Sequence, residues 1–365
     1  MLDGIRGIAI VMVLLFHGTV IKANFGLAGL YHDLTKSLWT GVDLFFVLSG
    51  FLITGILVDS KNSKNFFKTF YLRRTLRIFP LYYAFMIFVL VICPYIPYLS
   101  QAAAKNIAGA QSYYWLYLSN FHLAQAGLRN IFLGPTWSLA IEEQFYLAWP
   151  LLIFLFSREN MARICLAIII GVFYLRSALF DTEVSAHAIY LLTYTRLDAL
   201  AAGSLAALLV RKKGGIPKLI PMAKLTALIS GAVLTYFLVT NQVIKINKNY
   251  IYFGYTCACI FFASIMVMAV GKPKGSFTYK LLTIPALSVL GKYCYALYLF
   301  NRPLVNIIQN SIFDPNKYAT NWGLLPAQLF FTFLLTLFSL LLAIISWHLF
   351  EKHLLKLKKH FPTRQ

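Results

Sequence analysis

Long apolar runs recur along the whole chain and are separated by shorter polar connections. A run of about 20 apolar residues is long enough to cross a bilayer as an α-helix. We therefore predict an all-α, polytopic membrane protein with about ten transmembrane helices. The predicted spans are residues 5–21, 38–58, 79–99, 139–156, 164–179, 187–210, 222–243, 250–270, 284–312 and 324–350.

The connections between these spans show no second soluble domain, and no internal repeat stands out. We predict a single transmembrane domain over residues 1–355 and a short basic cytoplasmic tail over residues 356–365. The longest connection, residues 100–138, contains the aromatic segment 112–121, which is too short to span and is predicted to be a re-entrant or surface-lying helix. Residues 61–77 carry six positive charges with aromatic residues between them, a pattern typical of an amphipathic helix on the inner leaflet.

The composition excludes an ordinary soluble protein, because 59% of the residues are hydrophobic, 12% are charged and the mean hydropathy is +0.70. The net charge of +21 invites a nucleic-acid interpretation, but Lys and Arg are concentrated in the connections on one side of the predicted membrane. That bias places both termini in the cytoplasm. The basic charge then serves topology and attraction to anionic lipids, so we expect no nucleic-acid partner. The five cysteines lie in apolar segments without zinc-like spacing, and neither a disulfide framework nor a metal site is predicted.

The first predicted span contains the residues that most directly suggest chemistry. Asp3, Arg6 and His17 fall on one helix face, and Arg6 and His17 are separated by roughly 16 Å along the axis. Ionisable groups inside a bilayer usually face a protein interior or an aqueous cavity. His17 can exchange a proton near neutral pH, which makes it the first candidate for acid–base chemistry. The alternative is a histidine that only hydrogen-bonds a neighbouring helix.

Further ionisable residues are expected near the outer half of the membrane. Asp43 lies near the outer start of the second span, Glu142 lies in the first turns of the fourth, and Arg302 lies in the outer part of the ninth. Glu142 and its neighbour Glu143 have a simpler alternative role, which is to complement a helix dipole. Arg196 lies near mid-membrane, where it and Asp198 form either a structural pair or part of a site.

Three arginines lie at the opposite, cytoplasmic end of the third span. Arg74 and Arg77 are three residues apart on one helix face, beside Tyr71, and Arg73 adds to the local field. Two guanidinium groups at this spacing suit phosphate oxygens. The alternative is that they are ordinary charges flanking a span. The positions of the ionisable residues together predict a phosphate site on the cytoplasmic side of the membrane and an acid–base site on the outer side.

Seven segments of the sequence form a recognisable series. They are residues 2–9 with His17, 41–52, 74–80, 136–146, 195–203, 291–299 and 346–352; the fourth reads Thr-Trp-Ser-Leu-Ala-Ile-Glu-Glu-Gln-Phe-Tyr. Together and in this order they resemble the bacterial integral-membrane acyltransferase family known as acyltransferase type 3. Members of that family transfer acetyl or other short acyl groups to hydroxyls of extracytoplasmic glycans.

The resemblance implies roles for individual residues. The family's Arg–His pair falls on Arg6 and His17, its Arg-x-x-Arg pair falls on Arg74 and Arg77, and its acid falls on Glu142. Many relatives carry a second histidine where this chain has Asn301. Some relatives end in a soluble hydrolase-like domain, which this sequence lacks, so a separate periplasmic acyltransferase is expected to carry out any second transfer.

The expected function is an O-acyltransferase of the bacterial cytoplasmic membrane that uses acyl-CoA, most simply acetyl-CoA, as its donor. Arg74, Arg77 and Arg73 would bind the donor phosphates, and His17 would act as general base. Glu142 or, as second choice, Asp43 would orient the imidazole. Further candidates for substrate or oxyanion contacts are Arg196, Arg302, Trp137 and Tyr146.

The acceptor is expected to be an extracytoplasmic polysaccharide or a lipid-linked glycan, and membrane lipids surround the protein. A transporter or flippase for a glycan is the alternative, since polar residues along a pore would give a similar pattern. That alternative lacks the internal repeat of many transporters and leaves the inner arginine pair without a role. A membrane scaffold without activity would leave the ionisable residues unexplained.

Overall fold

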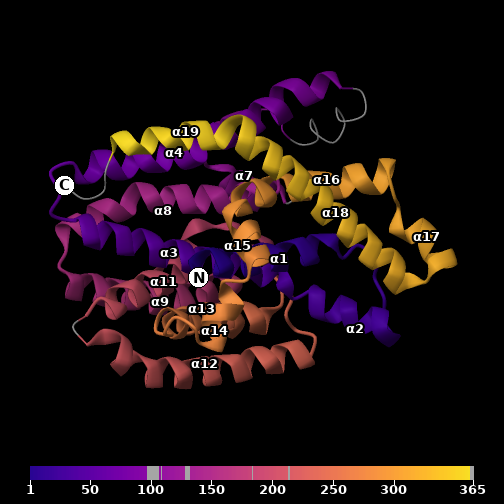
Figure 1. Cartoon of the computed structure of the whole chain (residues 1–365). Helices are drawn as coiled ribbons and strands as arrows, with labels where there is room; N and C mark the ends of the chain where they lie inside the picture. Colours follow the sequence, from indigo (N-terminus) through magenta and orange to yellow (C-terminus); the bar gives the residue numbers. More distant parts are fainter. Residues whose placement is uncertain (97–106, 108, 128–131, 183, 213, 362–365) are drawn as a thin grey trace.

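The computed structural model describes residues 1–96, 107, 109–127, 132–182, 184–212 and 214–361. Every regular element in these ranges is helical, and they contain no β-strand (Figure 1). The α-helices are α1 (Leu2–Gly18), α2 (Gly26–Thr35), α3 (Gly41–Ser60), α4 (Phe66–Ile87), α6 (Gln111–Trp115), α7 (Ser119–Ala126), α8 (Thr136–Leu155), α9 (Arg158–Phe180), α10 (Ala186–Leu191), α11 (Leu197–Val210), α12 (Gly215–Val239), α13 (Tyr255–Val270), α14 (Phe277–Leu282), α15 (Pro285–Lys292), α16 (Cys294–Ser311), α17 (Pro315–Trp322), α18 (Leu324–Ser346) and α19 (Lys352–Lys356).

Seven helical stretches within the described residues are long and apolar enough to cross a membrane. They are Gly26–Ser60, Phe66–Tyr95, Thr136–Leu155, Arg158–Phe180, Gly215–Val239, Tyr250–Val270 and Leu324–His360. The predicted all-α membrane fold is confirmed at this level. Helices α1 and α11 are shorter than 18 residues, and α16 interrupts its apolar face with Asn301, Arg302 and Asn306, so these three fall outside the seven.

Three sequence predictions differ from the observed helices. The predicted span 187–210 is two helices, because the chain leaves α10 and passes through a 3₁₀ turn at Thr193–Thr195 before α11 begins. The predicted span 284–312 is likewise divided at Tyr293. The basic segment 61–77 is not a separate surface helix: α4 begins at Phe66 and continues through Pro80, so its arginines lie on the first half of a membrane helix.

The aromatic segment 112–121 forms parts of two short helices, α6 and α7, where a single helix was predicted. Asn120 is buried and donates to the Thr193 hydroxyl at 2.9 Å, and Gln144 of α8 donates to Asn120 at 3.0 Å. These contacts tie the short helices to α8 and to the turn before α11. Residues 97–106, 108 and 128–131 of this connection lie outside the described residues.

Glycine allows the central helices α3 and α11 to pack at close range. A Cβ atom at Gly50 would collide with the Leu200 carbonyl, and one at Gly203 would collide with the Val47 carbonyl. Small residues at helix contacts are the usual way to bring membrane helices together. The same device joins α1 to the α14–α15 region, where Gly4 faces the carbonyl of Leu282.

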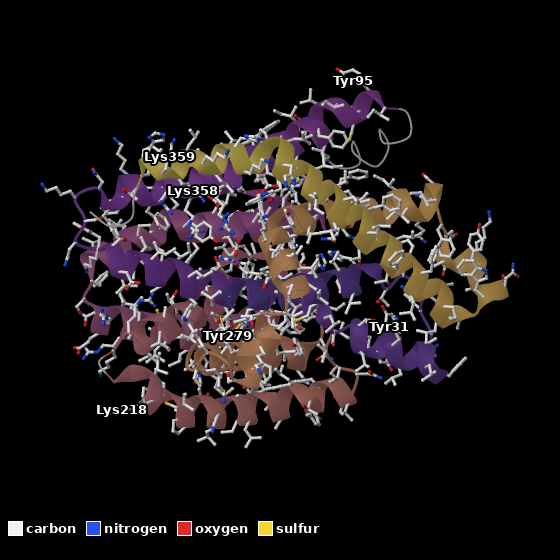
Figure 2. All side chains as sticks on the ribbon, in the orientation of Figure 1. Tyr31, Tyr95, Lys218, Tyr279, Lys358 and Lys359 are labelled. Carbon is white, nitrogen blue, oxygen red and sulfur yellow. The ribbon has the colours of Figure 1, made fainter. Side chains whose placement is uncertain are left out.

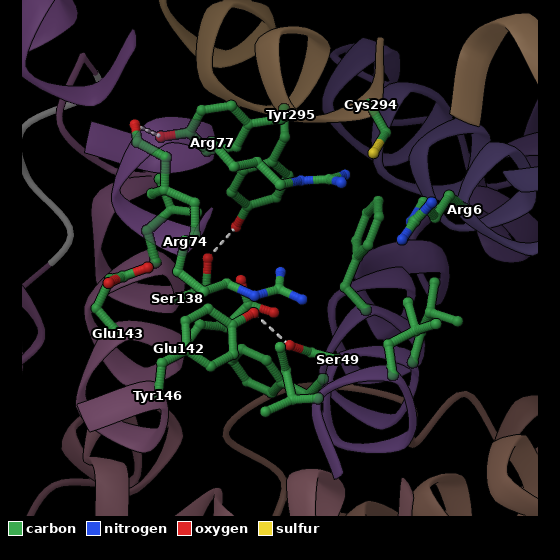
Figure 3. A pocket seen from close by; sticks show the side chains of 18 of the residues that line it. Arg6, Ser49, Arg74, Arg77, Ser138, Glu142, Glu143, Tyr146, Cys294 and Tyr295 are labelled. Atoms are coloured by element: carbon green, nitrogen blue, oxygen red, sulfur yellow. Dashed lines mark hydrogen bonds between the residues drawn. The ribbon is translucent and has the colours of Figure 1, made fainter. Parts of the chain in front are cut away.

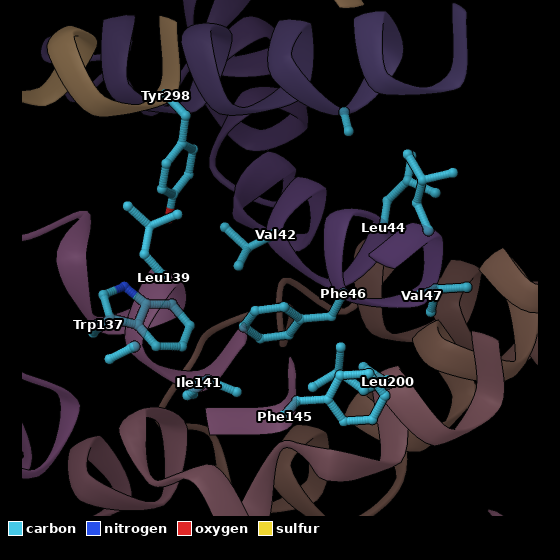
Figure 4. Close-up of a cluster of buried hydrophobic side chains, with 14 of the residues drawn as sticks. Val42, Leu44, Phe46, Val47, Trp137, Leu139, Ile141, Phe145, Leu200 and Tyr298 are labelled. Carbon is cyan, nitrogen blue, oxygen red and sulfur yellow. The ribbon is translucent and has the colours of Figure 1, made fainter. Parts of the chain in front are cut away.

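The core around α3 is apolar and aromatic (Figure 4). Phe46 of α3 meets the edge of Trp137 of α8, with ring centroids 5.9 Å apart, and both side chains are almost fully buried. Tyr298 of α16 reaches the same layer and hydrogen-bonds Ser138 at 2.5 Å. Helices α3, α8 and α16 therefore share one packed core, which positions the polar residues that they carry.

The C-terminal end of the described chain lies beside α4. Arg73 of α4 donates hydrogen bonds to the carbonyls of Lys358, at 3.3 Å, and Phe361, at 2.8 Å. Figures 1 and 2 show α19, with Lys358 and Lys359 just beyond it, alongside α4. The first part of the predicted tail is thus held against a helix that carries the arginine cluster.

Candidate functional site

Three cavities follow one another through the helices that carry the predicted site residues. We call them the inner, central and outer cavities; their volumes are about 320, 110 and 300 Å³. Arg74 and Arg77 line both the inner and the central cavity. Val42 and Tyr298 line both the central and the outer cavity. Adjacent cavities therefore share side chains in their walls.

The central cavity gathers charged residues from α1, α4 and α8 (Figure 3). Arg74 and Arg77 come from α4, Glu142 and Glu143 come from α8, and Arg6 comes from α1. Arg6 is also paired with Asp3. The i, i+3 spacing predicted Arg74 and Arg77 to share a face, and both do line one cavity. Three guanidinium groups and two carboxyl groups meet here.

Glu142 lies within a network of hydroxyl and guanidinium groups. Ser49 of α3 and Tyr146 of α8 are hydrogen-bonded to each other, and both are hydrogen-bond partners of the Glu142 carboxyl. Arg74 and Arg77 act on the carboxyl as nearby positive charges. Tyr146, which was predicted to contact substrate, lines the central cavity.

Arg74 is held between aromatic rings at the boundary of the inner cavity. Its guanidinium carbon lies 5.5 Å from the ring centroid of Tyr146 and 5.9 Å from that of Phe70. Such cation–π contacts fix the plane of a guanidinium while its N–H groups stay available for an oxyanion. The side chain is thus preorganised and is not a freely moving flanking charge.

The inner cavity combines cationic groups with small hydroxyls, as a phosphate site does. Arg73, Arg74 and Arg77 line it from α4, and Lys358 lines it from the C-terminal segment. The other polar lining residues are Asp59, Ser60, Ser63 and Thr69. Lys358 was missed in the sequence, because a lysine in a basic C-terminal segment carries no signal of which helix it meets.

His17 lines the outer cavity, and Asn301 of α16 is its hydrogen-bond partner. The Asn301 amide nitrogen donates to the carbonyls of Leu297, at 2.7 Å, and Tyr298, at 3.0 Å. Because both amide hydrogens are used, the amide oxygen faces the imidazole and accepts from Nδ1. The other ring nitrogen, Nε2, is then unprotonated in the neutral ring and can accept a proton.

No carboxylate orients His17 among the residues that the structure describes. Glu142, the first choice for that role, lies in the central cavity with Ser49 and Tyr146. Asp43, the second choice, is fully buried and paired with Arg196. The prediction that a carboxylate orients His17 is therefore wrong. The amide of Asn301 lies beside Nδ1 instead.

Arg196 is also not placed to contact a substrate. It is 1% exposed, its guanidinium stacks 4.4 Å from the Tyr255 ring centroid, and it lines none of the three cavities. The expected Arg196–Asp198 pair is replaced by two pairs, because Asp198 binds Arg176 of α9 at 2.8 Å. Arg176 and Asp198 are both fully buried, so the two pairs act as structural links between helices. Arg176 was missed because the sequence does not show which helices are neighbours.

The remaining predicted contacts, Trp137 and Arg302, do line the outer cavity. The structure adds Lys245, from the connection between α12 and α13. Its Nζ atom lies 4.7 Å from the ring centroid of Tyr190 and 5.7 Å from that of Trp39. Burial, followed by the positive charge of Arg302, lowers the pKa of Lys245 to about 7.

Comparison with known proteins connects this arrangement to a family. The family model described as "Acyltransferase domain" matches residues 1–345. The peptidoglycan O-acetyltransferase OatA of Listeria monocytogenes is 29% identical over 327 residues, which are 84% of this chain and 49% of that protein. The O-acetyltransferase OatA of Staphylococcus aureus is 27% identical over 326 residues, which are 85% of this chain and 51% of that protein.

The chain thus spans about half the length of the curated relatives that it matches. No solved structure matches it. The family match extends over α1, α4, α8 and α16, which carry His17, the two arginines, Glu142 and Asn301. The chain belongs to the integral-membrane acyltransferase family, acyltransferase type 3.

Proposed function

We propose that this protein is an O-acetyltransferase that carries an acetyl group from acetyl-CoA to a hydroxyl of an extracytoplasmic glycan. Peptidoglycan is the first candidate acceptor, because the Listeria relative is named as a peptidoglycan O-acetyltransferase. The single observation that carries the proposal is that the inner, central and outer cavities share lining residues from one to the next. Arg74 and Arg77 are shared by the inner and central cavities, and Tyr298 is shared by the central and outer cavities.

The proposed topology assigns these cavities to the two sides of the cytoplasmic membrane. Both termini are cytoplasmic and about ten segments cross, so that α1, α11 and α16 cross in addition to the seven long stretches. The distribution of Lys and Arg along the sequence supports this orientation. The inner cavity then opens toward cytoplasmic acetyl-CoA, and the outer cavity opens toward the glycan.

Donor binding is assigned to the inner cavity. The phosphates of acetyl-CoA are bound by Arg73, Arg77 and Lys358, and Arg74 stands where the inner cavity meets the central one. The charges of these side chains match the phosphate groups. Glu142 is a positioning residue, because its carboxylate balances the Arg74 guanidinium and fixes the Ser49–Tyr146 hydroxyl pair.

Transfer takes place where the thioester arm of the donor reaches the outer cavity. The Nε2 atom of His17 takes the proton of the acceptor hydroxyl while the hydroxyl oxygen attacks the thioester carbonyl carbon. The carbon–sulfur bond then breaks and the ester forms. The imidazolium of His17 returns the proton to the sulfur, and coenzyme A leaves as the free thiol. Of the two arginines predicted to contact substrate or oxyanion, only Arg302 lines the outer cavity, where it can contact the acceptor.

The test compares surface glycan from cells with the wild type, a deletion and His17→Ala, at matched amounts of membrane protein. His32→Ala serves as control, because His32 lies on α2 and lines none of the three cavities. Alkali-labile acetyl ester, measured by NMR and mass spectrometry, is expected to disappear in the deletion and in His17→Ala only. Unchanged ester with reduced glycan export would overturn the proposal in favour of a transporter.

A further inference from the structure

The outer cavity is lined by cationic groups without a matching anion. Arg302 and Lys245 line it beside the neutral imidazole of His17, and no Asp or Glu of the described residues does. Neither Arg302 nor Lys245 forms an ion pair with any residue that the structure describes.

The two fully buried arginines among the described residues both have carboxylate partners. Arg176 pairs with Asp198, and Arg196 pairs with Asp43. Withdrawing a cation from water is costly unless an anion compensates for the lost hydration. The rings around Lys245 compensate only in part, since a cation–π contact is weaker than a desolvated ion pair. The outer cavity therefore has room and charge for an anionic ligand.

The walls of the same cavity suit a sugar. Trp137 and Tyr190 lie with ring centroids 4.7 Å apart, and Trp39 meets the edge of Tyr190 at 5.5 Å. Aromatic side chains in a cavity wall can pack against the C–H groups of a pyranose. A volume of about 300 Å³ accommodates one or two sugar units.

We propose that the acceptor is an anionic glycan, and that Arg302 and Lys245 bind its carboxylate or phosphate group while its reacting hydroxyl lies at His17. This inference rests on the proposed function and specifies the substrate class of the same site. A carboxylate would come from an acidic sugar, and a phosphate would come from a lipid-linked or phosphorylated sugar. The two sources present the same chemistry to the two cations.

The test measures binding of defined saccharides to the purified full-length protein by isothermal titration calorimetry without donor. The first pair is neutral chitotetraose and a tetrasaccharide of alternating glucuronic acid and N-acetylglucosamine. The second pair is N-acetylglucosamine and its 1-phosphate. The wild type is expected to prefer the anionic member of at least one pair by about 10-fold or more, and the preferred pair identifies the source of the anion.

The variants Lys245→Gln and Arg302→Gln are each expected to reduce this preference about 10-fold while leaving acetyl-CoA affinity unchanged. Unchanged acetyl-CoA affinity also shows that the variants fold. Lys248→Gln is the matched control: Lys248 lies on the same connection, interacts with Asp181 at 3.6 Å and does not line the cavity. It is expected to retain the wild-type preference.

Equal binding of neutral and anionic saccharides would overturn the inference, as would a preference that survives in both glutamine variants. A role confined to the reaction's oxyanion would lower kcat in these variants without changing saccharide affinity, which also contradicts it. Failure of the proposed function would look different. In that case His17→Ala would transfer acetyl groups as the wild type does, or the wild type would transfer none, whatever the charge of the saccharide.

Discussion

Nδ1 of His17 donates a hydrogen bond to Oδ1 of Asn301, which joins α1 to α16 at the outer cavity. The amide is itself fixed by two carbonyls of its own helix. An uncharged partner determines the tautomer of the ring without adding a charge beside it. The Asn301 amide therefore acts on catalysis by orienting the His17 ring. Replacing the amide tests this role.

Asn301→Leu removes the acceptor for Nδ1 but keeps a side chain of similar size. We expect acetyl transfer to fall by about 10²-fold, because the ring loses its orientation and its preferred tautomer. Asn301→Asp retains an acceptor oxygen and is expected to keep activity within about 10-fold of the wild type. Initial rates of ester formation in membranes, at matched protein levels, measure both effects. Equal losses in the two variants would contradict the assigned role.

Arg74→Ala and Arg77→Ala remove guanidinium groups from the boundary between the inner and central cavities. A charge-assisted hydrogen bond contributes about 1.5–3 kcal/mol, so each variant is expected to raise the KM for acetyl-CoA by roughly 10- to 100-fold. The lysine replacements should recover only part of this loss, because an ammonium cannot make a bidentate contact.

The measurement is the rate of transfer as a function of acetyl-CoA concentration. Arg163→Ala is the control, because Arg163 is exposed on α9 and lines none of the three cavities. A KM unchanged in both Arg74→Ala and Arg77→Ala would show that the donor binds elsewhere.

Asp43→Asn leaves the buried Arg196 guanidinium without its counter-charge. Losing one partner of a buried ion pair typically costs about 3–5 kcal/mol of folding stability. We expect a clear drop in melting temperature in detergent and in the amount of folded protein in membranes. Asp43→Leu combined with Arg196→Met should recover part of the loss, since it removes both charges together.

The half-exposed pair of Asp59 and Arg211 provides the comparison for stability. Solvent screens this pair, so Arg211→Gln is expected to change stability by no more than about 1 kcal/mol. If the Asp43 and Arg211 variants lowered the melting temperature equally, the buried pair would not have the structural role assigned to it.

The pH dependence of anion binding should report Lys245. Burial and the charge of Arg302 lower the pKa of Lys245 to about 7, so the ammonium loses its proton as the pH rises through that value. Affinity for the preferred anionic saccharide should be highest near about pH 6 and fall about 10-fold by about pH 9. The decline extends above 7, because a bound anion favours the protonated form. The other ionisable groups that act on Lys245 or on its surroundings are His17, His187 and Arg196.

Lys245→Arg keeps a charge at this position throughout that pH range and should flatten the profile. Calorimetric titrations of the two proteins at several pH values make the comparison. An identical decline in wild type and Lys245→Arg would assign the titration to another group.

The helical architecture followed from the sequence because long apolar runs determine it locally. The grouping of Arg74 with Arg77 followed as well, since helix geometry alone puts residues three apart on one face. The break before α11 could not be predicted, because no Gly or Pro marks it in the sequence. Its cause is tertiary: Thr195 and Arg196 bond to partners on α10 and α3.

Pairings between distant segments were the part that failed. Asp43, Arg196 and Asp198 were recognised as buried ionisable residues, but their partners depend on which helices are neighbours. For the same reason, the sequence could not show that Glu142 and His17 line different cavities. Lys245 carried no local signal, because a lysine in a short connection is ordinarily exposed.

The central claim is that donor and acceptor are used from opposite sides of the membrane. Inverted membrane vesicles, with the cytoplasmic face outward, are loaded with peptidoglycan oligosaccharide and then given radiolabelled acetyl-CoA outside. The account predicts labelled ester on the enclosed glycan with the wild type and none with His17→Ala. With Arg74→Ala, a higher concentration of acetyl-CoA should be needed for the same rate of labelling. Label on the glycan only when donor and glycan share one side, or undiminished label with His17→Ala, would contradict it.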